Sequence, residues 1–184
     1  MVAGLILAAG SGSRMGQPKA QIEFKGERLV DRAVRIFKEA GLEKIYVVLG
    51  AWIGEVDGAQ VLVNQNWQEG MGSSLRLGLS TAMKDESISA VLVSLVDLPG
   101  ITASAVKAVM ESDHDLLIAT FEGAKGHPVK FSRSHWQGII DSAHGDVGAR
   151  NYLATRNDVF YLPLDSLATG SDIDTPEDFA HLDK

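Results

Sequence analysis

A glycine-rich stretch near the start of the chain constrains the fold more than any other feature. It follows the apolar run Val2–Leu7, which is too short to cross a membrane and is typical of a buried β-strand. Small residues dominate positions 8–16, and the stretch contains Arg14 and ends at Lys19. Backbone N–H groups that no side chain covers bind phosphate oxygens, and Arg and Lys supply the balancing charge. The stretch therefore predicts a phosphate-binding loop after the first strand of an α/β sheet.

Two common phosphate-binding motifs do not fit this loop. A Walker-type loop requires Gly-x-x-x-x-Gly-Lys-Ser/Thr, but Gly10 and Gly16 are one residue too far apart, and Gln17 and Pro18 precede Lys19. A dinucleotide-binding fingerprint requires G-x-G-x-x-G at a helix start, whereas these glycines stand at positions 10, 12 and 16, and the proline would break the helix. We expect an irregular loop through Lys19. The glycine spacing also argues against an oxidoreductase that uses a dinucleotide.

The composition is that of an ordinary globular protein. The 184 residues are 45% hydrophobic and 22% charged, which suits a single domain over residues 1–184. A formal net charge of −7 and the lack of a basic stripe argue against a nucleic acid partner. The absence of cysteine excludes thiol chemistry, and no apolar run approaches the ~20 residues of a membrane helix. We expect a cytoplasmic protein without a membrane partner.

Short apolar runs alternate with helix-like periodicity along the chain. The pattern predicts strands at 2–7, 22–24, 45–49, 61–64, 90–96, 116–120, 128–131 and 159–162. Helices are expected at 29–37, 102–110, 136–142 and 147–155, and two more begin at Ser73 or Ser74 and at Thr175. This alternation predicts a three-layer αβα, Rossmann-like α/β fold with a mostly parallel sheet. Ligands bind such sheets at the carboxyl ends of strands, where the opening loop, Asn64 and Asp97 fall.

Three aspartates are candidate metal ligands. Asp97 directly follows the most hydrophobic predicted strand, where a carboxylate can bind Mg²⁺ that bridges phosphate oxygens. A turn aspartate that accepts hydrogen bonds from nearby backbone donors is the alternative. Asp172 and Asp174 precede the helix start at Thr175, and they either complete the metal site or belong to a polar loop. The acidic residues of the following turn are explained by the helix dipole.

Two further glycine-containing segments could face substrates. Residues 64–74 lead from a strand into a helix N-terminus, whose free N–H groups suit a base edge or a phosphate, although capping would also explain the serines. Residues 145–150 repeat this pattern and add a guanidinium, so they either hold a second anionic substrate or join two helices. Among the histidines, only His127 occupies a candidate site position. Glycine loops, cations and a metal carboxylate together predict phosphoryl or nucleotidyl transfer.

The stretch Leu7–Lys19 resembles the signature of the nucleotidyltransferases related to those of molybdenum cofactor biosynthesis, which implies their glycosyltransferase-A-like fold. Four other segments resemble the molybdenum cofactor cytidylyltransferase branch: Asn64–Leu75, Gly126–Pro128, Gly145–Arg150 and Asp172–Asp178. The pair at positions 8 and 9, Ala-Ala, is similar to that branch, because the guanylyl branch commonly has Ala-Gly there. Leu98 departs from the Gln or Met that is usual between Asp and Pro.

The resemblance implies an Mg²⁺-dependent transfer of CMP from CTP to the molybdopterin form of the molybdenum cofactor, with release of pyrophosphate. It implies that Arg14 and Lys19 neutralise the triphosphate and that Asp97 holds the metal. Nucleotide contacts are implied for Leu7, Ala8, Ala9, Gly10, Ser11, Gly12, Asn64, Gly72, Ser73 and Ser74. Contacts on the pterin side are implied for His127, Gly145, Asp146, Gly148 and Arg150. A recipient molybdoenzyme is a further implied partner.

Three alternatives stay open at this stage. GTP could replace CTP, and the acceptor could be another phosphorylated molecule, such as a sugar phosphate or phospholactate. The chain could also be a non-catalytic nucleotide sensor or a cofactor chaperone on the same fold. The joint presence of Arg14, Lys19 and Asp97 argues against this last alternative, because a sensor has no need of all three.

Overall fold

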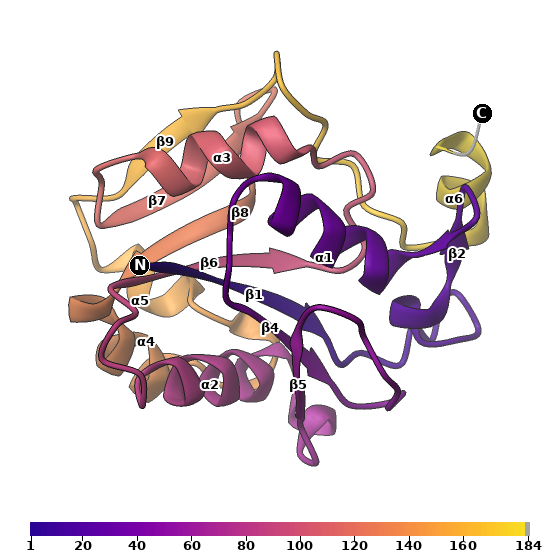
Figure 1. The fold of residues 1–184 in the computed structure, drawn as a ribbon, viewed down its shortest axis with the longest axis horizontal. Helices are drawn as coiled ribbons and strands as arrows, with labels where there is room; N and C mark the ends of the chain where they lie inside the picture. The colour runs from indigo at the N-terminus through magenta and orange to yellow at the C-terminus, as the bar shows by residue number, and fades with distance from the viewer. Residues whose placement is uncertain (183–184) are drawn as a thin grey trace.

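A seven-stranded sheet forms the centre of the molecule (Figure 1). The structure, a computed structural model, describes residues 1–182. The strands run in the order β5-β4-β1-β6-β8-β7-β9. Their bounds are β1 Val2–Ala8, β4 Ile45–Leu49, β5 Gln60–Val63, β6 Ala90–Leu95, β7 Leu116–Phe121, β8 Ala124–Ser132 and β9 Phe160–Pro163. In the described part of this sheet only β8 is antiparallel to its neighbours, so the predicted α/β fold with a mostly parallel sheet is confirmed.

Helices cover both faces of the sheet and complete the three layers. Figure 1 shows α1 (Leu29–Glu39) and α3 (Ala103–Glu111) on one side, and α2 (Met71–Ala82) and α4 (Trp136–Ser142) on the other. Two hydrophobic clusters, one for each face, bury the apolar sides of these helices against the strands. A short helix, α5 (Arg150–Ala154), follows α4. The last helix, α6 (Pro176–Leu182), packs through Phe179 on Phe24 of a small hairpin, β2 (Glu23–Phe24) and β3 (Glu27–Arg28).

Strand β1 is buried on both faces, which explains its unbroken run of apolar residues. Leu5 belongs to the cluster under α2 and α4, whereas Ile6 belongs to the cluster under α1 and α3, and both side chains are fully buried. Gly4 lets α1 approach the sheet closely, since a Cβ there would lie 2.5 Å from the ring of Phe37. A strand covered by helices on both faces needs apolar residues at every position, not only at alternate ones.

The order of the connections opens a crevice at the carboxyl edge of the sheet. From β1 the chain crosses through α1 to β4, and then to β5, on one side of β1. It returns through α2 to β6, which pairs with the other side of β1. Because the chain continues from β1 toward β4 and from β6 toward β7, in opposite directions along the sheet, a ligand crevice is expected between the loops that follow these two strands. The glycine-rich loop and Asp97 follow these two strands.

Besides shifts of one or a few residues at the ends of other elements, two predicted elements differ markedly from the structure. β8 is longer than predicted because Glu122 and Gly123 both adopt positive φ, and this tight turn pairs β7 with β8 as a hairpin. The helix predicted at 147–155 is instead a 3₁₀ turn, Gly145–Val147, followed by α5. Gly148 adopts φ +56° between them, and a residue in this left-handed region interrupts a helix.

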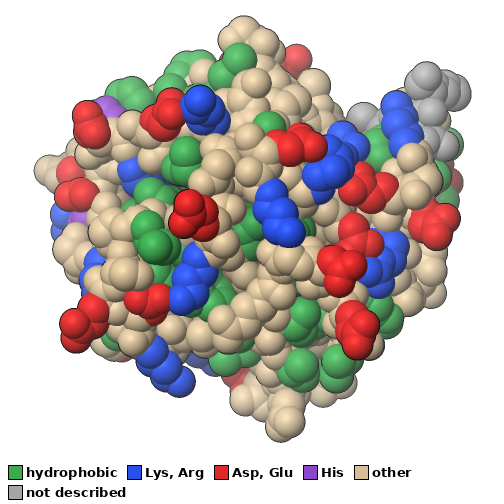
Figure 2. All heavy atoms as spheres, viewed as in Figure 1, with side chains coloured by type: hydrophobic (Ala, Val, Ile, Leu, Met, Phe, Trp, Pro, Cys, Tyr) green, Lys and Arg blue, Asp and Glu red, His purple; other side chains and the backbone are tan. Residues whose placement is uncertain are grey.

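Charged side chains of both signs intermingle on the face that carries α1 and α3, as Figure 2 shows. Examples are the ion pairs that Arg35 makes with Glu27 and Glu39 along α1. No helix within residues 1–182 combines the length and the apolar character that crossing a membrane requires.

Candidate active site

A cleft of about 450 Å³ lies at the carboxyl edge of the sheet, between the loops that follow β1 and β6. Its walls come from the glycine-rich loop, the segment that leads into α2, the end of β6 and the turn at Asp146. Many of the predicted site residues line it: Leu7, Ala8, Ala9, Gly10, Ser11, Gly12, Lys19, Ser74, Asp97 and Asp146. The lining combines apolar surface with a few charged groups, which is the usual character of a small-molecule site.

The glycine-rich loop folds back on itself beside the cleft. Gly12 adopts φ +61°, and its carbonyl accepts a hydrogen bond from the Met15 N–H over 2.8 Å. A Cβ on Gly12 would lie 2.0 Å from the carbonyl oxygen of Gln17, so only glycine fits there. The loop is shorter than expected, because Lys19 begins a 3₁₀ turn, Lys19–Gln21, directly after Pro18. Proline suits the position before a helical turn, where no N–H is needed.

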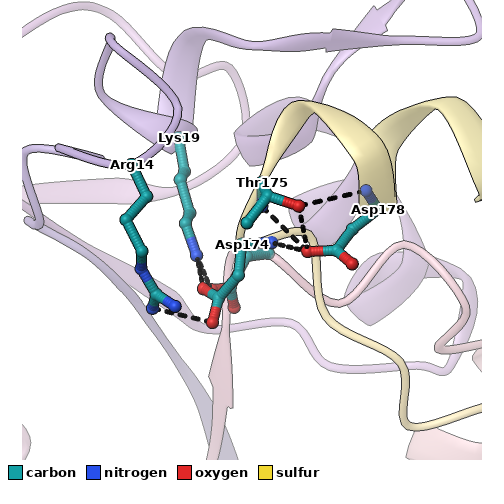
Figure 3. A network of polar contacts seen from close by, with 6 residues as sticks. Arg14, Lys19, Asp174, Thr175 and Asp178 are labelled. Atoms are coloured by element: carbon teal, nitrogen blue, oxygen red, sulfur yellow. Dashed lines mark hydrogen bonds and ion pairs between the residues drawn. The ribbon is translucent and has the colours of Figure 1, made fainter.

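Four charged side chains from distant parts of the chain form one ion-pair cluster, most of which is labelled in Figure 3. Lys19 Nζ donates to Asp97 Oδ2 over 2.6 Å and to Asp174 Oδ1 over 2.5 Å. Arg14 Nη2 lies 2.7 Å from Asp174 Oδ2. The side chains of Lys19 and Asp97 are 17% and 15% exposed, whereas that of Arg14 is 68% exposed. The two predicted phosphate-binding cations thus pair with two of the three predicted metal ligands.

The cluster shifts the pKa values of Lys19 and Asp174 in opposite directions. Burial alone would lower the pKa of Lys19, but its hydrogen bonds to Asp174 and Asp97 and their charges outweigh burial and raise that pKa. The hydrogen bond from Lys19, helped by the charges of Lys19 and Arg14, lowers the pKa of Asp174. Both groups are therefore ionised at neutral pH, and the formal charges of the four side chains cancel.

Two sets of backbone contacts hold Asp174 beside Asp97. The Ile173 N–H donates to the Asp97 carbonyl over 2.9 Å, which fixes the C-terminal segment against the end of β6. Asp178 Oδ2 accepts from the N–H groups of Asp174 and Thr175 over 3.2 and 2.9 Å. In return the Asp178 N–H donates to Thr175 Oγ1 over 3.2 Å. This reciprocal cap starts α6 where the sequence predicts a helix start, and it orients the carboxylate that Lys19 and Arg14 contact.

Asp97 and Asp174 fit the oxygen-ligand chemistry of Mg²⁺. A single ammonium group contacts both carboxylates, so a single cation can reach both. Asp97 Oδ1 is buried and has no hydrogen-bond partner among the described residues, which leaves one oxygen available to a ligand. Mg²⁺ commonly takes one or two protein carboxylates and completes its shell with phosphate oxygens and water.

Asp172 does not share in this arrangement. Its side chain is exposed, and residues 1–182 contain no group of three acidic or histidine side chains that could hold a metal ion. The predicted set of Asp97, Asp172 and Asp174 is therefore reduced to a pair that the structure brings together. The two C-terminal aspartates differ in burial, since Asp172 is exposed whereas Asp174 is half-buried.

Asn64 supports the wall of the cleft through hydrogen bonds but is not one of the lining residues. Its buried Nδ2 donates to Ser73 Oγ and Ser74 Oγ over 2.8 and 2.9 Å, and its Oδ1 accepts from the Asn66 N–H over 2.9 Å. These bonds tie the end of β5 to the first turn of α2. Of the predicted nucleotide contacts in this segment, Ser74 lines the cleft, whereas Asn64, Gly72 and Ser73 are not among the lining residues.

The start of α2 packs against the turn Gly145–Val147. The helix begins at Met71, so the prediction that Ser73 or Ser74 caps it is wrong. Gly70 adopts φ +104°, and a Cβ there would lie 2.4 Å from the Gly145 carbonyl carbon and 2.6 Å from Asp146 Oδ1. Asp146 Oδ1 accepts from the Met71 N–H over 3.4 Å. A carboxylate from another part of the chain thus serves the helix start, where the helix dipole favours negative charge.

The position of Asp146 differs from what the family resemblance implies. The resemblance assigns Gly145, Asp146, Gly148 and Arg150 to the pterin side, but Asp146 lines the same cleft as the glycine-rich loop and contacts the segment assigned to the base. Arg150 is exposed and is not among the lining residues. A role of these residues in acceptor binding stays a prediction.

His127 lies on β8 and is not among the residues that line the cleft. Its Nδ1 is 3.2 Å from the carbonyl oxygen of Val93 on β6. Burial lowers the pKa of His127 below its ordinary value, although the hydrogen bond to Val93 and the charge of Asp97 oppose this shift. The imidazole is therefore neutral at pH 7, and a proton on Nδ1 leaves Nε2 as a hydrogen-bond acceptor.

Trp67, Gln68 and Met71 line the cleft, and they fall within the segment 64–74 that the sequence predicts to face a substrate, but none of them is among the individually predicted contacts. Trp67 begins a 3₁₀ turn, Trp67–Glu69, and packs closely on the end of β4. A Cβ at Gly50 would lie 2.6 Å from Trp67 Cβ and 2.9 Å from Ala9 Cβ. An aromatic residue just after a strand end was the available signal, but aromatic residues are also common in cores, so position alone does not identify a lining residue.

Known proteins resemble this chain in sequence and in fold. A family model described as the MobA-like NTP transferase domain matches residues 4–159. Nicotine blue oxidoreductase from Paenarthrobacter nicotinovorans is 30% identical over 98% of this chain and 96% of its own length. A probable molybdenum cofactor guanylyltransferase from Opitutus terrae is 34% identical over 56% of this chain and 51% of its own. The crystal structure of Rv0371c from Mycobacterium tuberculosis H37Rv, also known in complex with manganese, has a TM-score of 0.85 at 22% identity and covers 98% of this chain and 96% of that one.

Proposed function

The chain belongs to the MobA-like NTP transferase family, and from this membership we propose that it transfers CMP from CTP to the terminal phosphate of molybdopterin and releases pyrophosphate. One observation carries the proposal: Lys19 contacts both Asp97 and Asp174 at the cleft. The cations proposed to bind phosphate thus contact the carboxylates proposed to bind the metal. Nucleotidyl transfer needs this juxtaposition, because its catalysis consists mainly of positioning and charge neutralisation.

The residues of the chain act by holding the triphosphate and by balancing its charge. The backbone N–H groups of Gly10–Gly12 and the cations Arg14 and Lys19 bind the phosphates. The acceptor phosphate oxygen forms a bond to the α-phosphorus while the bond from that phosphorus to the pyrophosphate oxygen breaks. Arg14 and Lys19 stabilise the negative charge that pyrophosphate gains. A divalent cation held by Asp97 and Asp174 would neutralise the α-phosphate further.

The proposed preference for CTP rests on the residues at the end of the cleft that would hold the base, namely Ala8, Ala9 and Asp146. Ala8 and Ala9 are buried and line the cleft, and the pair Ala-Ala at these positions is similar to the cytidylyl branch. Asp146 can accept a hydrogen bond from the exocyclic amino group of cytosine. GTP is the second candidate nucleotide, because a similar protein from Opitutus terrae is named a probable molybdenum cofactor guanylyltransferase. Guanine also offers N–H donors to a carboxylate.

The acceptor is proposed to enter on the side of His127. The turn Gly145–Val147 packs on α2, which leaves the end of β8 as the other predicted contact surface. The His127 imidazole contacts the Val93 carbonyl oxygen on β6, the strand that leads to Asp97. A neutral imidazole can form a hydrogen bond with a pterin ring without adding charge to the site. A recipient molybdoenzyme would then bind the dinucleotide product.

The proposal is tested by incubating the purified protein with Mg²⁺, molybdopterin and either CTP or GTP. Pyrophosphate release and the dinucleotide product are both quantified, with sugar phosphates and phospholactate as alternative acceptors. We expect turnover with CTP and molybdopterin that exceeds turnover with GTP. Turnover with GTP alone would contradict the base assignment, and turnover with another acceptor alone would contradict the pterin assignment.

The likeness to nicotine blue oxidoreductase over nearly the full chain favours a second candidate function, a redox reaction. Because the chain has no cysteine, the electrons would have to come from a bound cofactor such as a reduced nicotinamide dinucleotide. The measurement is the loss of reduced-nicotinamide absorbance in the presence of protein and oxidised nicotine blue. Protein-dependent oxidation without pyrophosphate release from CTP or GTP would favour this candidate over nucleotidyl transfer.

A further inference from the structure

The ion-pair cluster pairs the groups that a bound metal–nucleotide complex would separate. Lys19 Nζ lies between Asp97 Oδ2 and Asp174 Oδ1, at 2.6 and 2.5 Å, which is where one cation would touch both carboxylates. We infer that Lys19 is a built-in substitute for the divalent cation in the nucleotide-free protein. Lys19 leaves the carboxylates only when a triphosphate draws it away, so cation and triphosphate bind cooperatively. This inference rests on the proposed function in that it takes a metal–triphosphate complex as the ligand.

The charges explain why neither ligand binds well alone. A divalent cation without nucleotide meets carboxylates whose charge Lys19 and Arg14 already balance, so it gains little and must displace an ammonium group. A triphosphate without a metal meets two cations that are already paired with Asp97 and Asp174, so drawing them away would leave two carboxylates facing each other. When both ligands arrive, each separated ion pair is replaced by a new one. Interactions between unit charges a few ångströms apart are large in a partly buried site, which makes the coupling strong.

The positions of the two cations identify Lys19 as the group that competes with the metal. The Lys19 side chain is 17% exposed and lines the cleft next to the glycine-rich loop, so its flexible stem can turn the ammonium from the carboxylates to phosphates bound by that loop. Arg14 is 68% exposed, and within residues 1–182 it forms an ion pair with Asp174 only. Lys19 contacts only Oδ2 of Asp97, so Oδ1, which is buried without a partner in residues 1–182, stays available to a metal ion.

The experiment measures Mn²⁺ binding by electron paramagnetic resonance, with and without a CTP analogue whose α,β-bridge is a methylene group. For the native chain we expect the analogue to tighten Mn²⁺ binding at least tenfold. Lys19→Met should bind Mn²⁺ without the analogue at least about tenfold more tightly than the native chain, because two carboxylates then lack their ammonium. The analogue should add much less in this variant. Arg14→Ala should show a smaller gain, and Lys107→Met, on the exposed face of α3, should behave as the native chain does.

Unchanged or weaker Mn²⁺ binding by folded Lys19→Met in the absence of the analogue would overturn the inference. Circular dichroism establishes that the variant is folded, and the exposed Arg14→Ala provides the same comparison in a variant whose core is untouched. The measurement needs no acceptor and no turnover. Absence of nucleotidyl transfer together with the expected Mn²⁺ behaviour would therefore contradict the proposed reaction, whereas transfer without that behaviour would contradict only the role of Lys19.

Discussion

Asp97 is the single residue on which the proposed reaction depends most. One of its oxygens holds Lys19 and the other is buried without a partner among residues 1–182. Asp97→Asn keeps the shape of the side chain but removes the charge that a metal ion requires. We predict that metal-dependent turnover falls about 10²-fold or more, which is the magnitude for one lost electrostatic stabiliser. The matched control is Asp141→Asn on the exposed side of α4, and near-native turnover of Asp97→Asn in the same assay would disprove the metal role.

Lys19 also links the cluster to the pH dependence of stability. Its pKa is raised above 10.5, so its stabilising contribution is complete below pH 10.5 and is lost as pH rises through the folded-state pKa. The pKa of Asp174 is lowered below 3.8, so its contribution is present above pH 3.8 and is lost as pH falls through the folded-state value. We predict that Lys19→Met lowers the free energy of unfolding by about 1–3 kcal/mol at pH 7.

Urea unfolding from pH 7 upward measures this difference. The gap between the native chain and Lys19→Met should be constant to about pH 10 and should then shrink, because the native chain alone loses the ammonium charge. A gap that persists unchanged well above pH 10.5 would mean that packing of the lysine stem, rather than its charge, stabilises the protein.

At the scale of elements, the contact between α2 and the turn Gly145–Val147 shapes the end of the cleft that we propose holds the base. Gly70→Ala places a Cβ at positive φ and within 2.4 Å of Gly145, so the turn and Asp146 must move. We predict at least tenfold weaker CTP binding by calorimetry, together with a loss of stability. Gly123→Ala is the control, because it has φ +80° but open space around the added Cβ. It should lose about 1 kcal/mol of stability and bind CTP normally; equal CTP affinities of both variants would contradict the structural role of Gly70.

The start of α6 is a second element that acts on the site from outside. Asp178 accepts from the N–H groups of Asp174 and Thr175, so it orients a carboxylate that it does not touch. Asp178→Ala should weaken Mn²⁺ binding in the presence of the CTP analogue about tenfold or more, as for other supporting residues of metal sites. Glu177→Ala in the same helical turn removes equal charge without these bonds. If both variants lose the same affinity, charge rather than orientation is responsible.

At the scale of the whole molecule, the sequence predicts the sheet well and the site only in part. The apolar runs of β1 and β6 predict central buried strands, and the carboxyl-edge rule then places the glycine-rich loop and Asp97 side by side. The pairing of Lys19 with Asp174 joins residues that are 155 positions apart, and no local pattern distinguishes Asp174 from Asp172. Only the path of the C-terminal segment along Asp97 selects between them.

The wall of the cleft at the start of α2 is also hard to predict, because contacts between distant parts of the chain form it. Asn64 at a strand end has the character of a ligand-binding residue, yet its bonds to Ser73 and Ser74 satisfy it internally. Asp146 reaches α2 from a turn 75 positions away, so a serine within the helix was a more economical cap on local grounds.

The fate of the α-phosphate tests the central claim most directly. The protein is incubated with Mg²⁺, molybdopterin and CTP labelled at either the α- or the γ-phosphorus. The account predicts that α-label appears in the pterin dinucleotide and γ-label in pyrophosphate, in equal amounts and at rates that Asp97→Asn lowers about 10²-fold or more. Transfer of the γ-label to the acceptor would contradict this prediction. Failure to transfer α-label from CTP or GTP to any phosphorylated acceptor would also contradict it.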